Sequence, residues 1–140
     1  MTLDSGPYRI RNAGRPVGRA RTETFDLAPK AVFAATDDEN AVWIVEALPG
    51  GRHKLYAKRA PTGIGNDAPA GPLVALLVGQ EHAEEWELTA VDGTVDGYEV
   101  RSRQGVVWLA PAEGAHGPVE VLPALDDLGR STFVFERVHA

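Results

Sequence analysis

The sequence VWIVEAL, residues 42–48, recurs twice further along the chain, as EWELTAV at 85–91 and as TFVFERV at 132–138. In each copy apolar and polar side chains alternate, which is typical of a β-strand with one face in a protein core. The copies bring one aromatic residue each into register, and these are Trp43, Trp86 and Phe133. An aromatic position repeated in every copy predicts a core layer rather than a binding site.

The repeat extends beyond these strands. Tripeptides with a central charged residue follow one another at intervals of 45 residues, as YRI at 8–10, HKL at 53–55 and YEV at 98–100. One such unit cannot bury its apolar face alone, whereas three units can close around a common axis. We therefore expect a single domain of three units, at about 1–48, 49–93 and 94–140.

Helical periodicity is absent from most of the chain, and fifteen glycines and ten prolines interrupt it every few residues. The exception is 80–85, where a single helical turn is expected. Short strands are expected at 7–12, 15–19, 31–35, 42–47, 52–58, 61–64, 72–78, 85–91, 97–102, 106–110, 118–122 and 133–138. Twelve short strands in three four-strand units, related by pseudo-threefold symmetry, predict an all-β fold of the β-trefoil type.

The composition of the chain argues against several classes of function. A formal net charge of −6 disfavours a nucleic-acid partner, and the absence of cysteine leaves no disulfide or thiol chemistry. The longest apolar run, 73–78, is too short to cross a bilayer, and the N-terminus shows no secretory signal pattern. We expect a monomer that lies in the cytoplasm, or is released without a classical signal, and has no membrane partner.

Catalytic and cofactor motifs are also missing. The four histidines lie far apart without a metal-ligand spacing, so neither a metal nor a cofactor is expected. Adjacent acids such as Asp37 and Asp38 would point to opposite faces of a strand, which is unsuitable for a glycosidase pair. Ricin-type lectins carry Gln-x-Trp in each unit, whereas Ala41 and Glu84 stand at those glutamine positions here. We therefore expect no enzyme, and a lectin role would require an atypical site.

Function is expected in the loops, because irregular surface segments present side chains from a rigid scaffold. The long loops are expected at about 20–30, 64–71 and 123–132. A basic residue followed by a small one occurs at Arg21-Thr22, Lys30-Ala31 and Arg130-Ser131. This pattern fits the substrate site of a trypsin-type protease, in which a cation enters a pocket with a carboxylate at its base.

The first of these loops also contains large apolar residues. We expect Phe25 and Leu27 to pin the loop to the barrel, while Pro29 restricts its backbone. Arg21 would then be free for presentation to a partner. Lys30 ranks behind Arg21 and Arg130, because it directly abuts a predicted strand.

Four segments resemble the fungal β-trefoil protease inhibitors, most closely the cospin-type serine protease inhibitors. They are GPYRI at 6–10, VWIVE at 42–46, APTG at 60–63 and QEHAEEWEL at 80–88. The resemblance covers nearly the whole chain and implies inhibition of trypsin-like enzymes through one exposed loop. Members use the loop between the second and third strands or the loop between the last two strands. This implies protease contacts at Arg21 and Thr22, at Arg130 and Ser131, or at Lys30.

Two further alternatives follow from related proteins. The mycocypin type of fungal trefoil inhibits papain-like cysteine proteases with loops of the first unit, and legumain-like enzymes with an exposed asparagine. Resemblance to these implies contacts at Asn12 and the turn at Gly14, or at Asn66. A trefoil that inhibits nothing and binds a glycan or another protein is the second alternative.

Overall fold

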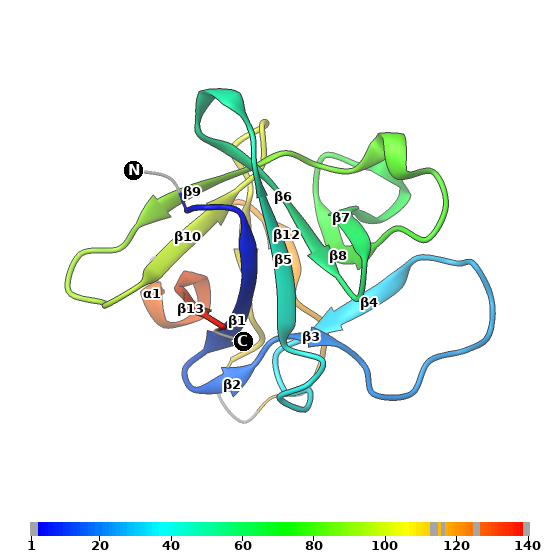
Figure 1. Ribbon diagram of the computed structural model, residues 1–140, viewed down its shortest axis with the longest axis horizontal. Coiled ribbons are helices and arrows are strands. Elements are labelled where there is room, and N and C mark those ends of the chain that lie inside the picture. Colours follow the sequence, from blue (N-terminus) through cyan, green and yellow to red (C-terminus); the bar gives the residue numbers. More distant parts are fainter. Residues whose placement is uncertain (1–2, 113–114, 116, 125–126, 139–140) are drawn as a thin grey trace.

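Residues 3–112, 115, 117–124 and 127–138 are described by the computed structural model shown in Figure 1. Their secondary structure is almost entirely β, as predicted. The strands are β1 (Gly6–Asn12), β2 (Arg15–Pro16), β3 (Gly18–Arg19), β4 (Lys30–Phe33), β5 (Val42–Ala47), β6 (Arg52–Ala57), β7 (Ala60–Ile64), β8 (Gly71–Ala75), β9 (Trp86–Ala90), β10 (Gly97–Arg101), β11 (Val107–Leu109), β12 (Glu120–Leu122) and β13 (Phe133–Arg137). The helical elements among these residues are α1 (Leu128–Ser131) and the 3-10 turns η1 (Pro49–Gly51), η2 (Gly65–Asp67) and η3 (Gln80–His82).

Six of the strands form a closed ring. β1 pairs with β5 and β13, β6 pairs with β5 and β9, and β10 pairs with β9 and β13, all antiparallel. The register places Tyr8 opposite Trp43 and Tyr98 opposite Phe133. The repeated strands of the sequence, β5, β9 and β13, are therefore alternate members of this ring. Closure leaves none of its six strands with a free edge.

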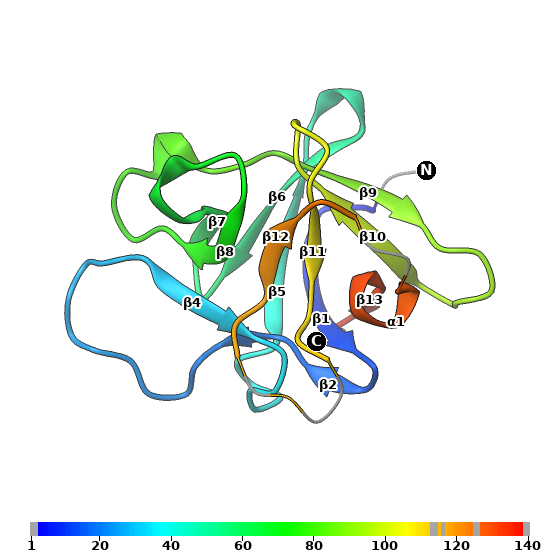
Figure 2. The same ribbon diagram turned by 180° about the vertical axis from the view of Figure 1, so that it is seen from behind.

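Three hairpins, β3–β4, β7–β8 and β11–β12, pair with one another in a second cycle. β8 pairs with both β4 and β12, and a bridge between Phe33 and Pro118 joins the first hairpin to the third. Figure 2 shows β4, β8 and β12 beside one another from behind. Each hairpin thus contacts the other two, which is the arrangement that three equivalent units produce.

The expected strand at 15–19 is divided in the structure, so the described residues form thirteen strands where twelve were predicted for the chain. Arg15 pairs with Asn12 in β1, whereas Gly18 pairs with Phe33 in β4. The chain changes its pairing partner at the fully buried Val17 between them. The expected helical turn before Trp86 is present as η3. The expected loop at 123–132, in contrast, contains the short helix α1, whose first turn is capped by Asp127.

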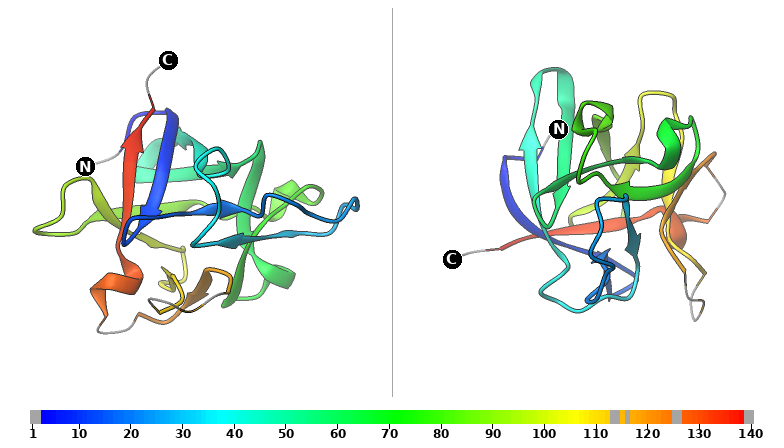
Figure 3. Two further views of the ribbon diagram at one scale, coloured as in Figure 1. Left: turned by 90° about the horizontal axis from the view of Figure 1, so that it is seen from below. Right: turned by 90° about the vertical axis from the view of Figure 1, so that its right-hand side faces the viewer.

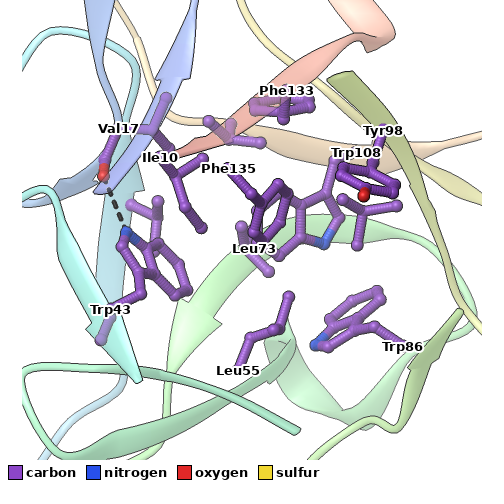
Figure 4. Close-up of a cluster of buried hydrophobic side chains, with 14 of the residues drawn as sticks. Ile10, Val17, Trp43, Leu55, Leu73, Trp86, Tyr98, Trp108, Phe133 and Phe135 are labelled. Carbon is purple, nitrogen blue, oxygen red and sulfur yellow. Dashed lines mark hydrogen bonds between the residues drawn. The ribbon is translucent and has the colours of Figure 1, made fainter. Parts of the chain in front are cut away.

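The core is built around an aromatic residue that the repeat did not predict. Trp108 lies with its ring centre 5.5 Å from those of Trp43 and Trp86 and 5.4 Å from that of Phe133 (Figure 4). All four side chains are fully buried. The core interpretation of the repeated aromatic positions is therefore confirmed, and the exposure of Trp108, which the sequence left undetermined, is zero.

Trp108 stands where the 45-residue spacing of the sequence places glycine twice before it, at Gly18 and Gly63. A side chain at Gly18 has no room, because a Cβ there would lie 1.9 Å from the Asn40 carbonyl oxygen. Trp108 thus fills the space between Trp43, Trp86 and Phe133 with one large side chain. Close-packed cores resist deformation, so the loops extend from a firm scaffold.

Candidate functional site

The loop between β3 and β4 projects further from the barrel than its neighbours. In Figure 1 it leaves β3, swings out to the right-hand edge of the molecule and returns as β4, and the left panel of Figure 3 shows the same projection from below. Residues 20–29 form this segment, which we call the 20–29 loop. It matches the long loop predicted at 20–30, except that Lys30 is the first residue of β4.

A buried arginine holds the first half of the loop. The side chain of Arg19 is 8 % exposed, and its Nη2 lies 2.6 Å from Glu23 Oε1 while its Nε donates to Glu23 Oε2 at 3.1 Å. Its Nη1 donates to the carbonyl oxygen of Ala57 at 3.2 Å. This fork-to-fork geometry is the strongest form of arginine–carboxylate contact. It ties the loop at Glu23 to β6.

A buried lysine holds the second half. The side chain of Lys30 is 6 % exposed, and its Nζ lies 2.6 Å from Asp26 Oδ1. The same ammonium donates to the carbonyl oxygen of Thr24 at 2.9 Å and to the Thr24 hydroxyl at 3.2 Å. The hydrogen bond that Lys30 Nζ donates to Asp26 Oδ1, more than any other contact, holds the pKa of Asp26 below its ordinary value. Lys30 therefore shapes the loop from within, and the structure does not present its charge to a partner.

The apolar residues of the loop do not pack on the barrel. Phe25 is fully exposed at 109 %, and Leu27 is 64 % exposed. The expectation that these two side chains pin the loop is wrong, because the two ion pairs formed by Arg19 and Lys30 do so instead. Pro29 is also exposed. The apex of the loop consequently combines a restrained backbone with free apolar side chains.

Arg21 lies on the exposed side of the same loop, with 87 % of its side chain accessible and its Nε 4.0 Å from Asp37 Oδ2. Thr22, which follows it, is exposed as well. The backbone on either side is restrained, since Lys58 Nζ donates to the Ala20 carbonyl oxygen at 3.3 Å and Glu23 is bound by Arg19. The predicted pair Arg21 and Thr22 thus lies between two fixed points.

The second predicted pair stands in a different setting. Arg130 and Ser131 belong to α1, so the peptide bond between them is helical rather than extended. Nε of Arg130 donates to the Ala110 carbonyl oxygen at 2.8 Å, and Ser131 is buried. A protease binds its substrate as an extended strand. This segment would have to unwind before it could occupy an active-site cleft.

Of the residues expected to contact a cysteine protease or legumain, Asn12 is buried whereas Gly14 and Asn66 are exposed. Asn12 is buried, and its amide donates to the carbonyl oxygens of Gly129 and Thr132 while its side-chain oxygen accepts from Arg15. Its role in this structure is to join β1 to the segment around α1. Gly14 is exposed at a φ of 78° in the turn after β1, and a Cβ there would meet nothing within 4 Å. Asn66 is exposed at a φ of 60° within η2.

Arg19, Glu23 and Asp26 were not predicted as part of the site. A signal for them exists in the sequence, because Glu23 lies four residues after Arg19 and Asp26 lies four residues before Lys30. In the absence of a helix this spacing carries no expectation of contact. The burial of both cations depends on the barrel behind them.

The described residues include no group of three or more side chains that could hold a metal ion. No helix within the described ranges is long and apolar enough to cross a membrane. Of the four histidines, His116 and His139 lie outside the described residues. Trp43 and Trp86 are buried and hydrogen-bonded to Val17 and Thr62, so neither indole face is available as a stacking platform for a sugar.

The described residues thus define a small all-β barrel with one projecting loop that is held by the ion pairs of two buried cations. The chain belongs to the peptidase inhibitor I66 family, whose model matches residues 1–137. Its partner is therefore a protease, and the protein is an inhibitor rather than an enzyme.

Solved structures support the fold. A proteinase inhibitor from Coprinopsis cinerea superposes with a TM-score of 0.84 at 24 % identity, over 98 % of this chain and 100 % of that one. The designed three-fold symmetric protein ThreeFoil superposes with a TM-score of 0.72 at 16 % identity, over 94 % and 99 % of the two chains. A lectin from Polyporus squamosus gives 0.71 at 13 % identity, over 96 % of this chain and 50 % of its own. None of the curated proteins compared with this sequence is similar enough to count as a relative.

Proposed function

We propose that this protein is a β-trefoil inhibitor of serine proteases with trypsin-like specificity, and that it inserts Arg21 into the primary pocket of its target. The trefoil assignment rests on the ring of six strands, the cycle of three hairpins and the similarity to a three-fold symmetric design. We infer one domain of three units that acts as a monomer in the cytoplasm.

The observation that carries the choice of residue is the contrast between the exposed Arg21 and the cations around it. Arg19 and Lys30 are buried in ion pairs, and Arg130 is hydrogen-bonded to the barrel within a helix. Arg21 alone among these four combines high exposure with a segment that is not helical. Its guanidinium would exchange a 4.0 Å contact with Asp37 for the carboxylate of a trypsin-type pocket.

Restraint of the loop supplies the affinity in this mechanism. Ordering an interface costs about 0.5–1.5 kcal/mol for each immobilised side chain, and a loop already held in one conformation avoids much of that cost. The loop backbone is held on both sides of Arg21 and Thr22 by Lys58 and Arg19. The inhibitor would then bind as a substrate does, with the Arg21 carbonyl group directed at the catalytic serine and its oxyanion hole.

The test is inhibition of trypsin by the purified protein and by matched variants. We expect stoichiometric inhibition by the native protein, and a loss of about 100-fold or more in affinity for Arg21→Ala, because primary-pocket residues dominate such interfaces. Arg21→Lys should retain inhibition, since a trypsin-type pocket accepts either cation. Arg103→Ala, in the exposed turn between β10 and β11, serves as the surface control. Loss of inhibition in Arg130→Ala, with Arg21→Ala fully active, would move the site to α1.

The cysteine-protease alternative is tested in the same way with papain and with a legumain-type enzyme. Asn66 is the residue to change for the latter, because it is exposed in a tight turn. Inhibition of papain or legumain by a protein that leaves trypsin, chymotrypsin and subtilisin active would replace the serine-protease proposal.

A further inference from the structure

We propose that the 20–29 loop has a second specificity, in which Phe25 enters the primary pocket of a serine protease that accepts large apolar residues, of the chymotrypsin type. This inference rests on the proposed function in one respect, namely that the 20–29 loop is the protease-binding element. The complex is non-covalent, with no bond made or broken.

The first support is the exposure of Phe25. An aromatic side chain of this size gains roughly 1.5–3 kcal/mol when it is removed from water, so full exposure at 109 % forgoes that stabilisation. The barrel nearby offers apolar contacts, since Leu77 lines the hollow beside the loop together with Phe25 and Leu27. The ring nevertheless stands clear of the surface, in a geometry suited to entering a pocket on another molecule.

The second support is the way the backbone is held around Phe25. Lys30 Nζ donates hydrogen bonds to both neighbours of Phe25. Before Phe25 it bonds the carbonyl and hydroxyl oxygens of Thr24, and after Phe25 it bonds Asp26 Oδ1. One buried ammonium therefore bridges the two neighbours of Phe25. In a substrate-like complex these neighbours lie on either side of the pocket residue and of the peptide bond that follows it. Holding both keeps that bond in place, which favours binding over turnover.

The third support concerns charge. A free carboxylate directly after the pocket residue would carry its charge into a cleft that excludes water, which is costly. The Asp26 carboxylate lies 2.6 Å from the Lys30 ammonium and also accepts a hydrogen bond from the Ala28 amide at 3.3 Å. Its charge is thus balanced within the loop. Phe25 is flanked by a neutralised pair rather than by an unpaired acid.

Arg21 and Phe25 cannot serve one enzyme molecule at the same time. They are four residues apart, which corresponds to at most about 13–14 Å along an extended chain, and a protease has one primary pocket. A target bound at either residue would cover the other. The proposal therefore predicts that a trypsin-type and a chymotrypsin-type enzyme compete for a single inhibitor molecule.

The experiment measures inhibition constants against bovine-type trypsin and chymotrypsin for the native protein, Phe25→Ala, Phe25→Tyr and Arg21→Ala. We expect Phe25→Ala to weaken chymotrypsin inhibition by about 100-fold while trypsin inhibition changes by less than about threefold, and Arg21→Ala to do the reverse. Phe25→Tyr should retain chymotrypsin inhibition. Inhibitor saturated with a trypsin variant whose catalytic serine is replaced by alanine, which leaves its primary pocket open, should no longer bind chymotrypsin.

Phe25 has no packing role, so its variants should melt at the native temperature, and thermal unfolding checks this. Trypsin inhibition with no effect on chymotrypsin at micromolar protein would overturn the inference and leave the proposed function standing. Chymotrypsin inhibition unchanged in Phe25→Ala, or simultaneous binding of both enzymes, would overturn it as well. A protein that inhibits no protease through the 20–29 loop would instead remove the proposed function itself.

Discussion

The Nζ atom of Lys30 lies 2.6 Å from Asp26 Oδ1 at the base of the 20–29 loop, with the lysine side chain buried and the carboxylate half-exposed. The contact joins the first residue of β4 to a loop residue four positions before it. It also brings Thr24 to the same ammonium. A cation that the sequence offers as a protease contact is thereby the residue that holds the shape of the 20–29 loop.

Lys30→Met tests this role of Lys30. Methionine keeps most of the buried stem but removes the three hydrogen bonds to Thr24 and Asp26, so the loop loses its restraint while the barrel keeps its packing. We expect inhibition to weaken by about 10-fold or more through a faster dissociation rate, with a small change in melting temperature. Lys54→Met, at a half-buried lysine of β6, is the matched control. If Lys30→Met speeds amide hydrogen exchange across 20–29 but leaves inhibition unchanged, restraint of the loop does not contribute to affinity.

The aromatic core makes a prediction about two tryptophans. Trp43 Nε1 donates to the Val17 carbonyl oxygen at 2.8 Å, whereas Trp108 Nε1 has no hydrogen-bond partner among the described residues. Both side chains are fully buried. Trp43→Phe would leave a buried carbonyl group unpaired, at an added cost of about 1–3 kcal/mol, whereas Trp108→Phe removes an unpaired donor.

Trp108→Phe should therefore reduce the free energy of unfolding less than Trp43→Phe does, although the two changes remove the same atoms. Urea unfolding followed by circular dichroism measures both. Equal losses would indicate that the volume of the ring, rather than the hydrogen bond, decides the cost.

The buried His53 makes stability depend on pH. Burial of its ring lowers its pKa below the ordinary value of 6.5, and nearby backbone groups of Trp86 and Leu3 offset this only in part. Neither ring nitrogen has a hydrogen-bond partner among the described residues. In the unfolded chain His53 takes up a proton as the pH falls through about 6.5, whereas in the folded barrel it does so only at lower pH.

The contribution of His53 to the free energy of unfolding should consequently be complete above about pH 7, and it should fall as the pH drops below about 6.5 toward the lowered pKa of folded His53. His53→Phe should flatten this part of the profile, and His82→Gln, in the exposed η3 turn, should leave it in place. Urea midpoints between about pH 5 and pH 8 measure the effect. A profile of His53→Phe that matches the native one would assign the slope to other groups.

The position of the 20–29 loop could be predicted from the sequence, but the contacts within the loop could not. The absence of a strand period over 20–29, between two predicted strands, predicts the loop, and the small residue after Arg21 makes that cation a candidate contact. Which cations are presented depends on contacts with distant segments, as when Ala57 and Lys58 accept hydrogen bonds from Arg19. The same dependence explains the wrong expectation for Phe25, whose size suggested packing that the fold does not provide.

By itself the sequence determined the all-β class, the three-part repeat and the burial of the repeated aromatic residues, because alternation and spacing are local properties that recur along the chain. The tertiary structure alone decided that Trp108 lies at the centre of the core and that Lys30 is buried and bonded to Thr24 and Asp26 of the 20–29 loop. It also decided that Phe25 stands free while Arg21 lies between two fixed points. The physical reason is that the energy of a long or charged side chain depends on partners brought together only when the barrel closes.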